Sequence, residues 1–161
     1  MKRKWLWSTL FAGLMVVLGL SLSSEPVHAA QKTYTIGTDV TFAPFEFADK
    51  NNKYVGIDID LMNAVAKTEG FKVDIKPLGF NAAVQALEAG QIDGVIAGMS
   101  ITPERQQKFF MSSPYYQSGV VMAVAKGSKI KSLSGLRGKK VAVKTGTASA
   151  DYAPYYLNWD N

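Results

Sequence analysis

Alternating and continuous apolar runs predict the strands of the first half of the chain. Residues 33–38 alternate between polar and apolar positions and indicate a strand that ends at Asp39. Residues 71–76 alternate in the same way, and residues 92–97 form a short apolar run that is typical of a buried strand. A shorter strand is expected at residues 54–55, after a polar turn.

Apolar residues recur at helical spacing in the two segments between these longer strands. We expect the first helix to be capped by Asp58 and to end at Gly70, and the second to be capped by Asn81 and to end at Gly90. This order of strands and helices is typical of an α/β protein with a parallel sheet and right-handed crossovers. The residues expected on the buried faces are Leu61, Met62, Val65, Ala66, Val84 and Leu87.

The turn that follows the third long strand is suited to an anion. Gly98 opens the backbone, and Thr102-Pro103 provides an N-cap hydroxyl and a proline at the first helical position. The free N–H groups of such a helix start attract a carboxylate or a phosphate. Ser100 adds a hydroxyl, and Arg105 adds planar donors that match two carboxylate oxygens. From these residues alone, an ordinary surface role for Arg105 is equally open.

Acidic and aromatic residues gather just after the first strand. Asp39, at the end of that strand, is most simply a turn residue that bonds its own backbone. Phe42, Phe45 and Phe47 crowd into the next segment, where aromatic rings commonly cover a core. The carboxyl ends of parallel strands are also where α/β proteins bind ligands, so a ligand-binding role stays open for both groups.

The second half of the chain contains fewer predicted elements. Residues 119–125 form an apolar run that we expect to be a strand leading out of the first unit, and residues 140–143 are another predicted strand. Turns are expected at residues 126–128 and 144–149, and a one-turn helix is expected at residues 132–136.

These elements predict two lobes of unequal completeness. Pro114 closes the first unit because a helix cannot continue through it. A lone strand and one helix cannot bury their own faces. We therefore expect a first lobe at residues 30–117, a crossover strand at residues 118–125 and an incomplete second lobe at residues 126–161.

The N-terminus has the pattern of a secretory signal peptide. A basic start at residues 1–4 precedes apolar residues 5–22, and small residues near Ala29 suit signal peptidase. We expect a signal peptide at residues 1–29, which would place the mature protein in the periplasm or outside the cell. The apolar run is also just long enough to cross a bilayer, so an uncleaved anchor stays open. Without a Cys, lipid attachment is not expected.

Composition excludes several classes of chemistry. The chain has no Cys and one His, which is His28 in the predicted signal peptide. Catalysis by Cys or His and metal sites built from them are therefore excluded for the mature protein. Much of the net charge of +5 also belongs to the signal peptide, and no basic run with interleaved aromatic residues suggests nucleic-acid binding.

Four motifs, in order and at matching spacing, resemble a known family. They are Gly37-Thr38-Asp39 with residues 42–47, Tyr54 to Leu61, Ala97 to Arg105, and Val143 to Thr147. The chain resembles the polar amino-acid-binding proteins of bacterial ABC importers (solute-binding family 3), and most of all the glutamine-binding members. The resemblance implies a periplasmic binding protein type II fold, with lobe 1 nearly complete and lobe 2 only begun. It also implies a monomer that delivers a free amino acid to a membrane permease without a cofactor or metal.

The resemblance implies a role for each site residue. Arg105 would hold the α-carboxylate of the ligand, helped by Ser100 and by the N–H of Ala148. The Gly98 carbonyl would accept from the α-ammonium, and Phe42 and Phe80 would flank the aliphatic stem. Asp39 and Lys144 would face the ligand side chain. The sequence departs from the family at Ser100, where many relatives have Thr, and at Ala148, where a Gly is common.

The pair Asp39 and Lys144 indicates which side chain would be bound. An acceptor beside a donor suits a neutral carboxamide, so glutamine is the first choice. A basic side chain would meet like charge from Lys144, and an acidic one would meet like charge from Asp39. If Lys144 only pairs with Asp39, basic amino acids become candidates again.

One departure concerns the second lobe. In the family this lobe continues further and supplies an acidic residue for the α-ammonium. We therefore expect the 161-residue chain to be a fragment or a truncated reading frame that binds weakly or not at all.

The sequence also leaves room for an enzyme or a sensor. Lys144-Thr145-Gly146 matches a motif of penicillin-recognising enzymes, but its companion motifs are absent or misplaced, so we expect no enzyme. A dehydratase-like enzyme or a sensor lobe of the same architecture stays as an alternative.

Overall fold

The computed structural model describes residues 30–157. The predicted signal peptide, with its alternative as an anchor, lies outside these described residues. Within residues 30–157, no helix combines the length and apolar character needed to cross a bilayer.

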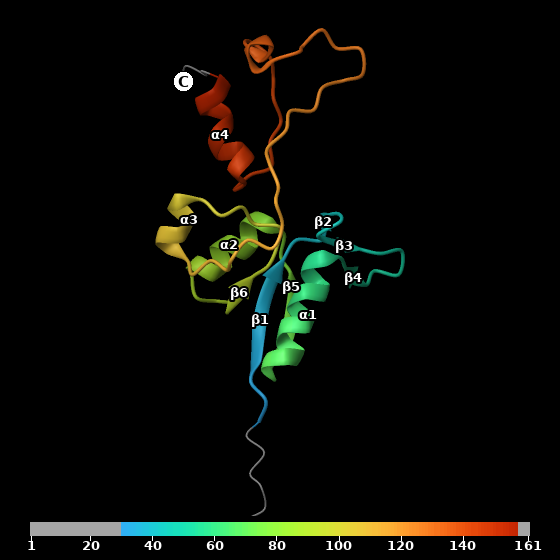
Figure 1. Cartoon of the computed structure of the whole chain (residues 1–161), viewed down its shortest axis with the longest axis vertical. Coiled ribbons are helices and arrows are strands. Elements are labelled where there is room, and N and C mark those ends of the chain that lie inside the picture. Colours follow the sequence, from blue (N-terminus) through green and yellow to red (C-terminus); the bar gives the residue numbers. More distant parts are fainter. Residues whose placement is uncertain (1–29, 158–161) are drawn as a thin grey trace, which may run out of the picture. The chain divides into compact units, whose positions relative to one another are not determined.

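A parallel sheet lies at the centre of the first half of the chain (Figure 1). Its strands are β1 (Thr33–Thr38), β5 (Lys72–Pro77) and β6 (Gly94–Val95), in the order β5-β1-β6. Ile36 of β1 lies opposite Ile75 of β5 and Gly94 of β6. The predicted strands and their parallel order are confirmed, although β6 is shorter than the predicted residues 92–97.

The short β6 is extended by individual hydrogen bonds. The Ile96 N–H donates to the Gly37 carbonyl at 3.1 Å, and the fully buried Thr38 hydroxyl donates to the Ile96 carbonyl at 2.7 Å. The chain therefore leaves β1 and β6 at neighbouring points of the sheet edge.

The aromatic segment after β1 forms a small antiparallel sheet. Its strands are β2 (Thr41–Phe42), β3 (Glu46–Ala48) and β4 (Tyr54–Val55), in the order β2-β3-β4. The sequence predicted only β4 and treated the rest as a loop. Strands of two or three residues are too short to show a period.

Two helices connect the strands of the parallel sheet. Helix α1 (Ile57–Glu69) ends at Gly70, which has a φ of 72° and the left-handed conformation expected for this position. Helix α2 (Phe80–Glu88) ends just before the predicted Gly90. Apolar side chains of both helices pack on the sheet, with Ala83 fully buried and Ala66 nearly so.

The predicted caps of these helices were wrong. Gly56 and Gly79 occupy the N-cap positions, whereas Asp58 and Asn81 lie within the first turns. In α1 the reason is that loop carbonyls already satisfy the first N–H groups. The Asp58 N–H donates to the Phe45 carbonyl at 2.9 Å, so the Asp58 side chain is available for other partners.

The buried face of α1 also differs from the prediction. Ile59 is 6% exposed, whereas Val65 is 40% exposed. Val65, with Leu61 and Met62, borders an open cavity and is not enclosed in the core. The remaining predicted core residues, Val84 and Leu87, are half-buried.

Helix α3 (Pro103–Lys108) begins as the sequence predicts. Thr102 is its N-cap, and the Thr102 hydroxyl accepts a hydrogen bond from the Arg105 N–H at 3.3 Å. Pro103 occupies the first turn, where a missing N–H costs nothing.

Residues 118–147 contain no strand, so the strands predicted at residues 119–125 and 140–143 were wrong. A strand needs a neighbour that pairs with its backbone, and among the described residues these segments have none. The one-turn helix at Leu133–Leu136 (η2) and the predicted turns are confirmed, and α4 (Ala148–Leu157) follows the last turn.

Candidate functional site

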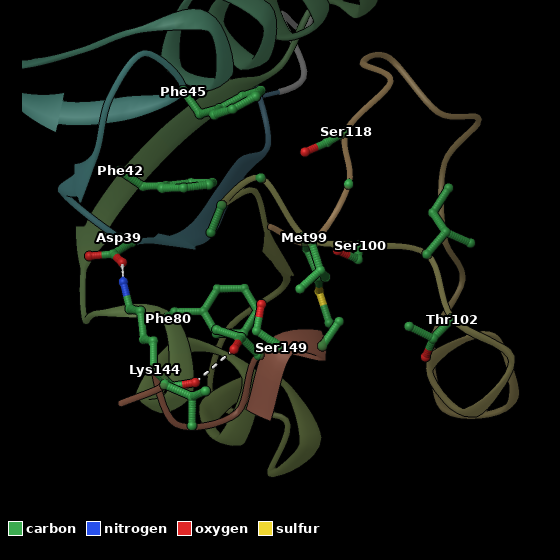
Figure 2. A pocket seen from close by; sticks show the side chains of 18 of the residues that line it. Asp39, Phe42, Phe45, Phe80, Met99, Ser100, Thr102, Ser118, Lys144 and Ser149 are labelled. Carbon is green, nitrogen blue, oxygen red and sulfur yellow. Dashed lines mark hydrogen bonds and ion pairs between the residues drawn. The ribbon is translucent and has the colours of Figure 1, made fainter. Parts of the chain in front are cut away.

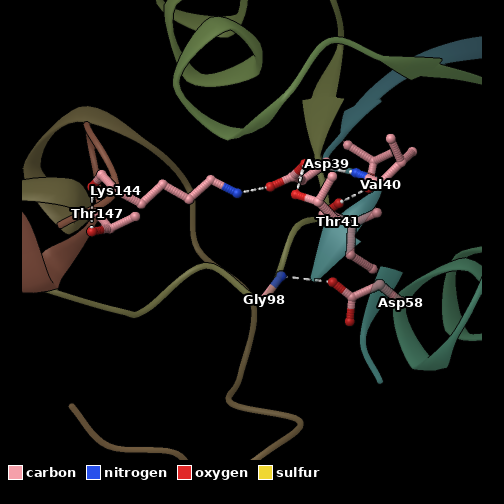
Figure 3. Close-up of polar contacts among 9 residues, drawn as sticks. Asp39, Val40, Thr41, Asp58, Gly98, Lys144 and Thr147 are labelled. Carbon is pink, nitrogen blue, oxygen red and sulfur yellow. Dashed lines mark hydrogen bonds and ion pairs between the residues drawn. The ribbon is translucent and has the colours of Figure 1, made fainter. Parts of the chain in front are cut away.

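Asp39 lies at the carboxyl end of β1 and is 4% exposed. Its Oδ1 atom accepts hydrogen bonds from the Val40 N–H at 2.7 Å and from the Thr41 hydroxyl at 3.0 Å. Its Oδ2 atom forms an ion pair with the Lys144 ammonium group (Figure 3). Asp39 is therefore both a turn residue, as the simplest interpretation held, and the partner of a distant cation.

Opposing effects act on the ionisation of Asp39. Burial alone would raise the pKa of this carboxyl group. Hydrogen bonds from Lys144, the Val40 N–H and Thr41 outweigh burial and leave the pKa below its ordinary value. The site therefore contains a carboxylate that stays ionised at neutral pH.

Arg105 extends from the first turn of α3 and is 9% exposed. Its two terminal nitrogens each donate to a carbonyl at 2.9 Å, Nη1 to Ser100 and Nη2 to Gly146. The guanidinium carbon lies 5.6 Å from the centre of the Phe80 ring, within range of a cation–π contact. These contacts argue against an ordinary surface role.

Arg105 keeps donors for a further acceptor. A guanidinium has five N–H donors, and the described contacts use two of them. Both partners are neutral carbonyls, and no carboxylate of the described residues lies within salt-bridge distance of Arg105. A ligand carboxylate would therefore meet a cation whose charge is not already paired.

Aromatic rings border the space between Asp39 and Ser100 (Figure 2), and Gly98 lines the same cavity. Phe42 stacks on Phe45 with the ring centres 5.2 Å apart, and Phe42 remains 44% exposed. Gly98 has a φ of 53°, and a Cβ atom here would lie 2.7 Å from Phe42 Cε1. Only glycine therefore allows this backbone to pass so close to the ring.

All the predicted site residues line one cavity. Its volume is about 2430 Å³, which is far more than a small-molecule pocket of about 300–1,000 Å³ contains. The excess arises because unpaired residues 118–143 border one side of it without closing it. The predicted residues brought together are Asp39, Phe42, Phe80, Gly98, Ser100, Arg105, Lys144 and Ala148. Their individual roles toward a ligand stay predictions.

The sequence reasoning missed a buried acidic cluster beside this site. Glu46 and Asp58 are both fully buried. Asp58 accepts hydrogen bonds from the Gly98 N–H at 2.6 Å and from the Tyr115 hydroxyl at 2.9 Å. No N–H or O–H group of the described residues donates to either carboxyl oxygen of Glu46, and its polar neighbour is the Asp58 carboxyl group.

Glu46 is uncharged at neutral pH. Burial first, and then the neighbouring Asp58 carboxyl group, raise the pKa of Glu46 to about 9. One signal in the sequence could have found it. Glu46 lies between Phe45 and Phe47, so in a strand its side chain points to the face opposite to both rings. A lone acid in such an apolar segment is a candidate for burial.

The residues of the site suit binding better than metal chemistry. Within residues 30–157, no group of three or more His, Cys, Asp or Glu side chains is placed to hold a metal ion. The site instead provides an ionised acid, an unpaired guanidinium and the exposed ring of Phe42. This combination fits a zwitterion with an apolar stem.

Known proteins match most of the chain. The lysine/arginine/ornithine-binding periplasmic protein of Escherichia coli is 38% identical over 141 residues, which is 87% of this chain and 54% of that protein. An ancestral arginine-binding protein, solved with arginine and with glutamine, is 45% identical, with a TM-score of 0.75. That match covers 81% of this chain and 58% or 59% of the solved chains. The chain thus spans little more than half the length of these relatives.

A third similarity concerns catalysis. An ancestral amino acid-binding protein described as a precursor of cyclohexadienyl dehydratase is 42% identical, with a TM-score of 0.68. The match covers 78% of this chain and 58% of that one. Its description names a binding protein, although a dehydratase descends from it.

These similarities confirm the fold class expected from the sequence. The chain has the periplasmic binding protein type II fold, with a parallel sheet in a mixed α/β arrangement, and it covers part of that fold. Residues 34–155 match the family description. The chain belongs to the bacterial extracellular solute-binding proteins, family 3.

Proposed function

We propose that this chain is part of the solute-binding component of an amino-acid ABC importer, located in the periplasm or outside the cell. It binds a free polar amino acid and delivers it to a membrane permease. The observation that carries the proposal is that the paired carboxylate of Asp39 and the unpaired guanidinium of Arg105 border the same cavity.

The chemistry of the two ends of the cavity differs. Arg105 offers planar donors to the α-carboxylate. The Phe42 ring, which is 44% exposed, offers apolar surface to the stem, whereas Phe80 is only 7% exposed and packs beneath the Arg105 guanidinium. Asp39 is an acceptor for the end of the side chain. The ligand is therefore an amino acid whose side chain ends in N–H donors.

Basic side chains and neutral carboxamides meet this requirement, and arginine and glutamine represent these two classes. Names of the relatives favour a basic amino acid and do not support the expected preference for glutamine. The Lys144–Asp39 ion pair favours a carboxamide, because its donor and acceptor would each find a partner. Arginine and glutamine are therefore the candidate ligands, and Lys144 is the residue that decides between them.

Titration of isotopically labelled residues 30–161 with arginine, glutamine and glutamate tests the proposal by NMR, which detects millimolar binding. Glutamate is the matched control, since it has the size of glutamine but lacks side-chain N–H donors. We expect arginine or glutamine, but not glutamate, to shift the amide signals of Asp39, Ser100 and Arg105. If no amino acid shifts these signals, the proposal that this chain binds a free amino acid at the cavity is wrong.

Substitution of Lys144 by Met then separates the two candidates. Without the ammonium group, arginine no longer meets a like charge, and glutamine loses a hydrogen-bond donor for its carboxamide oxygen. We expect K144M to bind arginine more tightly and glutamine more weakly than the wild type. An unchanged ratio of the two dissociation constants would remove Lys144 from the ligand site.

Binding without turnover is better supported than catalysis for this chain. Both carboxylate oxygens of Asp39 already have partners, which are the Val40 N–H and the Thr41 hydroxyl at Oδ1 and the Lys144 ammonium group at Oδ2. The relatives described above are named for binding. Recovery of unaltered amino acid after prolonged incubation with the chain would agree with this conclusion, and formation of a product would contradict it.

A further inference from the structure

Asp58 joins two segments that border the cavity, although it lines no part of the cavity itself. It is fully buried in the first turn of α1. One of its oxygens accepts from the Gly98 N–H and the other from the Tyr115 hydroxyl. Figure 3 shows the first of these contacts beside the Asp39–Lys144 pair.

The Gly98 end of this connection is the start of the loop of residues 98–102, which the sequence predicts to bind an anion. Gly98 lies against the Phe42 ring, and the loop continues to Ser100, whose carbonyl accepts from Arg105. The hydrogen bond from Gly98 to Asp58 is short, at 2.6 Å, as expected when the acceptor is charged. The position of this amide therefore fixes where the loop begins.

The Tyr115 end lies in the segment that leads to residues 118–125. Burial and the Asp58 carboxylate raise the pKa of the Tyr115 hydroxyl, so it remains a donor. The next residue, Tyr116, packs edge-on against Phe45 with ring centres 4.8 Å apart. Tyr115 thus attaches this segment to Asp58 in α1, and Tyr116 attaches it to Phe45.

A carboxylate is the group that this arrangement requires. Its two oxygens accept from both donors at once, whereas an amide has one acceptor oxygen. Asp58 is fully buried, whereas Tyr115 is 40% exposed. Loss of the Tyr115 hydroxyl therefore leaves one oxygen of a buried carboxylate without its donor.

The geometry points to Asp58 as a positioning residue for ligand binding, which couples the Gly98 loop to the segment beginning at Tyr115. This inference rests on the proposed function. Asp58 acts through the Gly98 amide and not by touching the ligand. A change at Tyr115 should therefore be felt at Gly98 and in the ligand affinity.

The test compares Tyr115→Phe with Tyr34→Phe. Tyr34 also loses one hydroxyl in this variant, but its ring packs on Phe71 and does not line the cavity. In the absence of ligand, Y115F should accelerate amide hydrogen exchange at Gly98 severalfold and leave Ile36 in β1 unchanged. With ligand, it should raise the dissociation constant about tenfold, as expected for a lost bond to a charged group. Y34F should change neither quantity.

Asp58→Asn extends the same test and should show a larger effect at Gly98. If D58N fails to fold, the Y115F measurement alone decides the matter. Unchanged exchange at Gly98 in Y115F would overturn the inference, as would equal acceleration at Gly98 and Ile36, which would indicate a merely structural role. Failure of the wild-type chain to bind arginine or glutamine would instead refute the proposed function, and the ligand-binding part of this inference with it.

Discussion

Residues 32–117 and residues 118–157 contain similar apolar runs, but only the first segment forms strands. In the first, β1 lies between β5 and β6, and Ile36 is 7% exposed. In the second, the run at residues 119–125 has no partner among the described residues, and Val121 is 88% exposed. Apolar, β-branched sequence is therefore insufficient for a strand. The backbone must also find a neighbour with which to pair.

The sharpest test of this comparison is to shorten one side chain in each segment. Ile36→Ala removes buried methyl groups and should lower the free energy of unfolding by about 3 kcal/mol. Val121→Ala changes an exposed side chain and should alter it by less than about 0.5 kcal/mol. Urea denaturation of residues 30–161 measures both. A cost for V121A close to that of I36A would show that the second segment is packed in solution.

A second test concerns the buried acid of the first segment. The pKa of Glu46 is about 9 in the folded chain and has an ordinary value of 4.5. Between these values the folded chain holds a proton that the unfolded chain releases, so stability is fully present below pH 4.5 and falls as pH rises toward 9. Glu46→Gln removes this loss and should stabilise the chain by about 2 kcal/mol at pH 8.

The gain from Glu46→Gln should shrink as the pH approaches 4.5, because both states then hold the proton. Thermal unfolding at pH 5 and pH 8 measures the difference. The other titratable groups near Glu46 are not substituted in this variant. They are Asp39, Asp58, Tyr115 and Lys144. A gain that is equal at both pH values would contradict a raised pKa.

The smallest effect is expected at the ion pair between the two segments. Lys144 is half exposed, so Lys144→Ala should cost less than about 1 kcal/mol of stability. It should raise the pKa of Asp39, because a hydrogen-bond donor and a positive charge are lost. The stability that this low pKa provides is present above the pKa of the unfolded chain and is lost as the pH falls. The free energy of unfolding of the variant should therefore fall less steeply at acidic pH.

NMR titration of the Asp39 carboxyl carbon measures this change directly. Lys129→Ala is the matched control, since Lys129 forms no salt bridge among the described residues. An unchanged Asp39 pKa in K144A would mean that the ion pair is not maintained in solution.

The sequence predicted much of the first segment, because hydrophobic period and terminating glycines act locally. Strand 33–38, the helix ending at Gly70 and the Thr102 cap all follow from such local signals. Local signals failed for the predicted Asp58 cap. The first turn of α1 is satisfied by the Phe45 carbonyl instead, and the path of that loop is seen only in the folded chain.

The site was predicted in composition but not in its connections. The motifs named Asp39, Arg105 and Lys144, and the fold brings all three to one cavity, although the strand predicted just before Lys144 does not form. The buried pair Glu46 and Asp58 escaped notice, because burial of an acid depends on what packs over it. That packing comes from residues far along the chain.

The Thr38 hydroxyl has a consequence for the thermodynamics of binding. Its bond to the Ile96 carbonyl joins the two strands just before Asp39 and Gly98. The spacing of these two contact points is thus fixed in advance of any ligand. Less entropy is then lost on complex formation, which is the advantage of preorganisation.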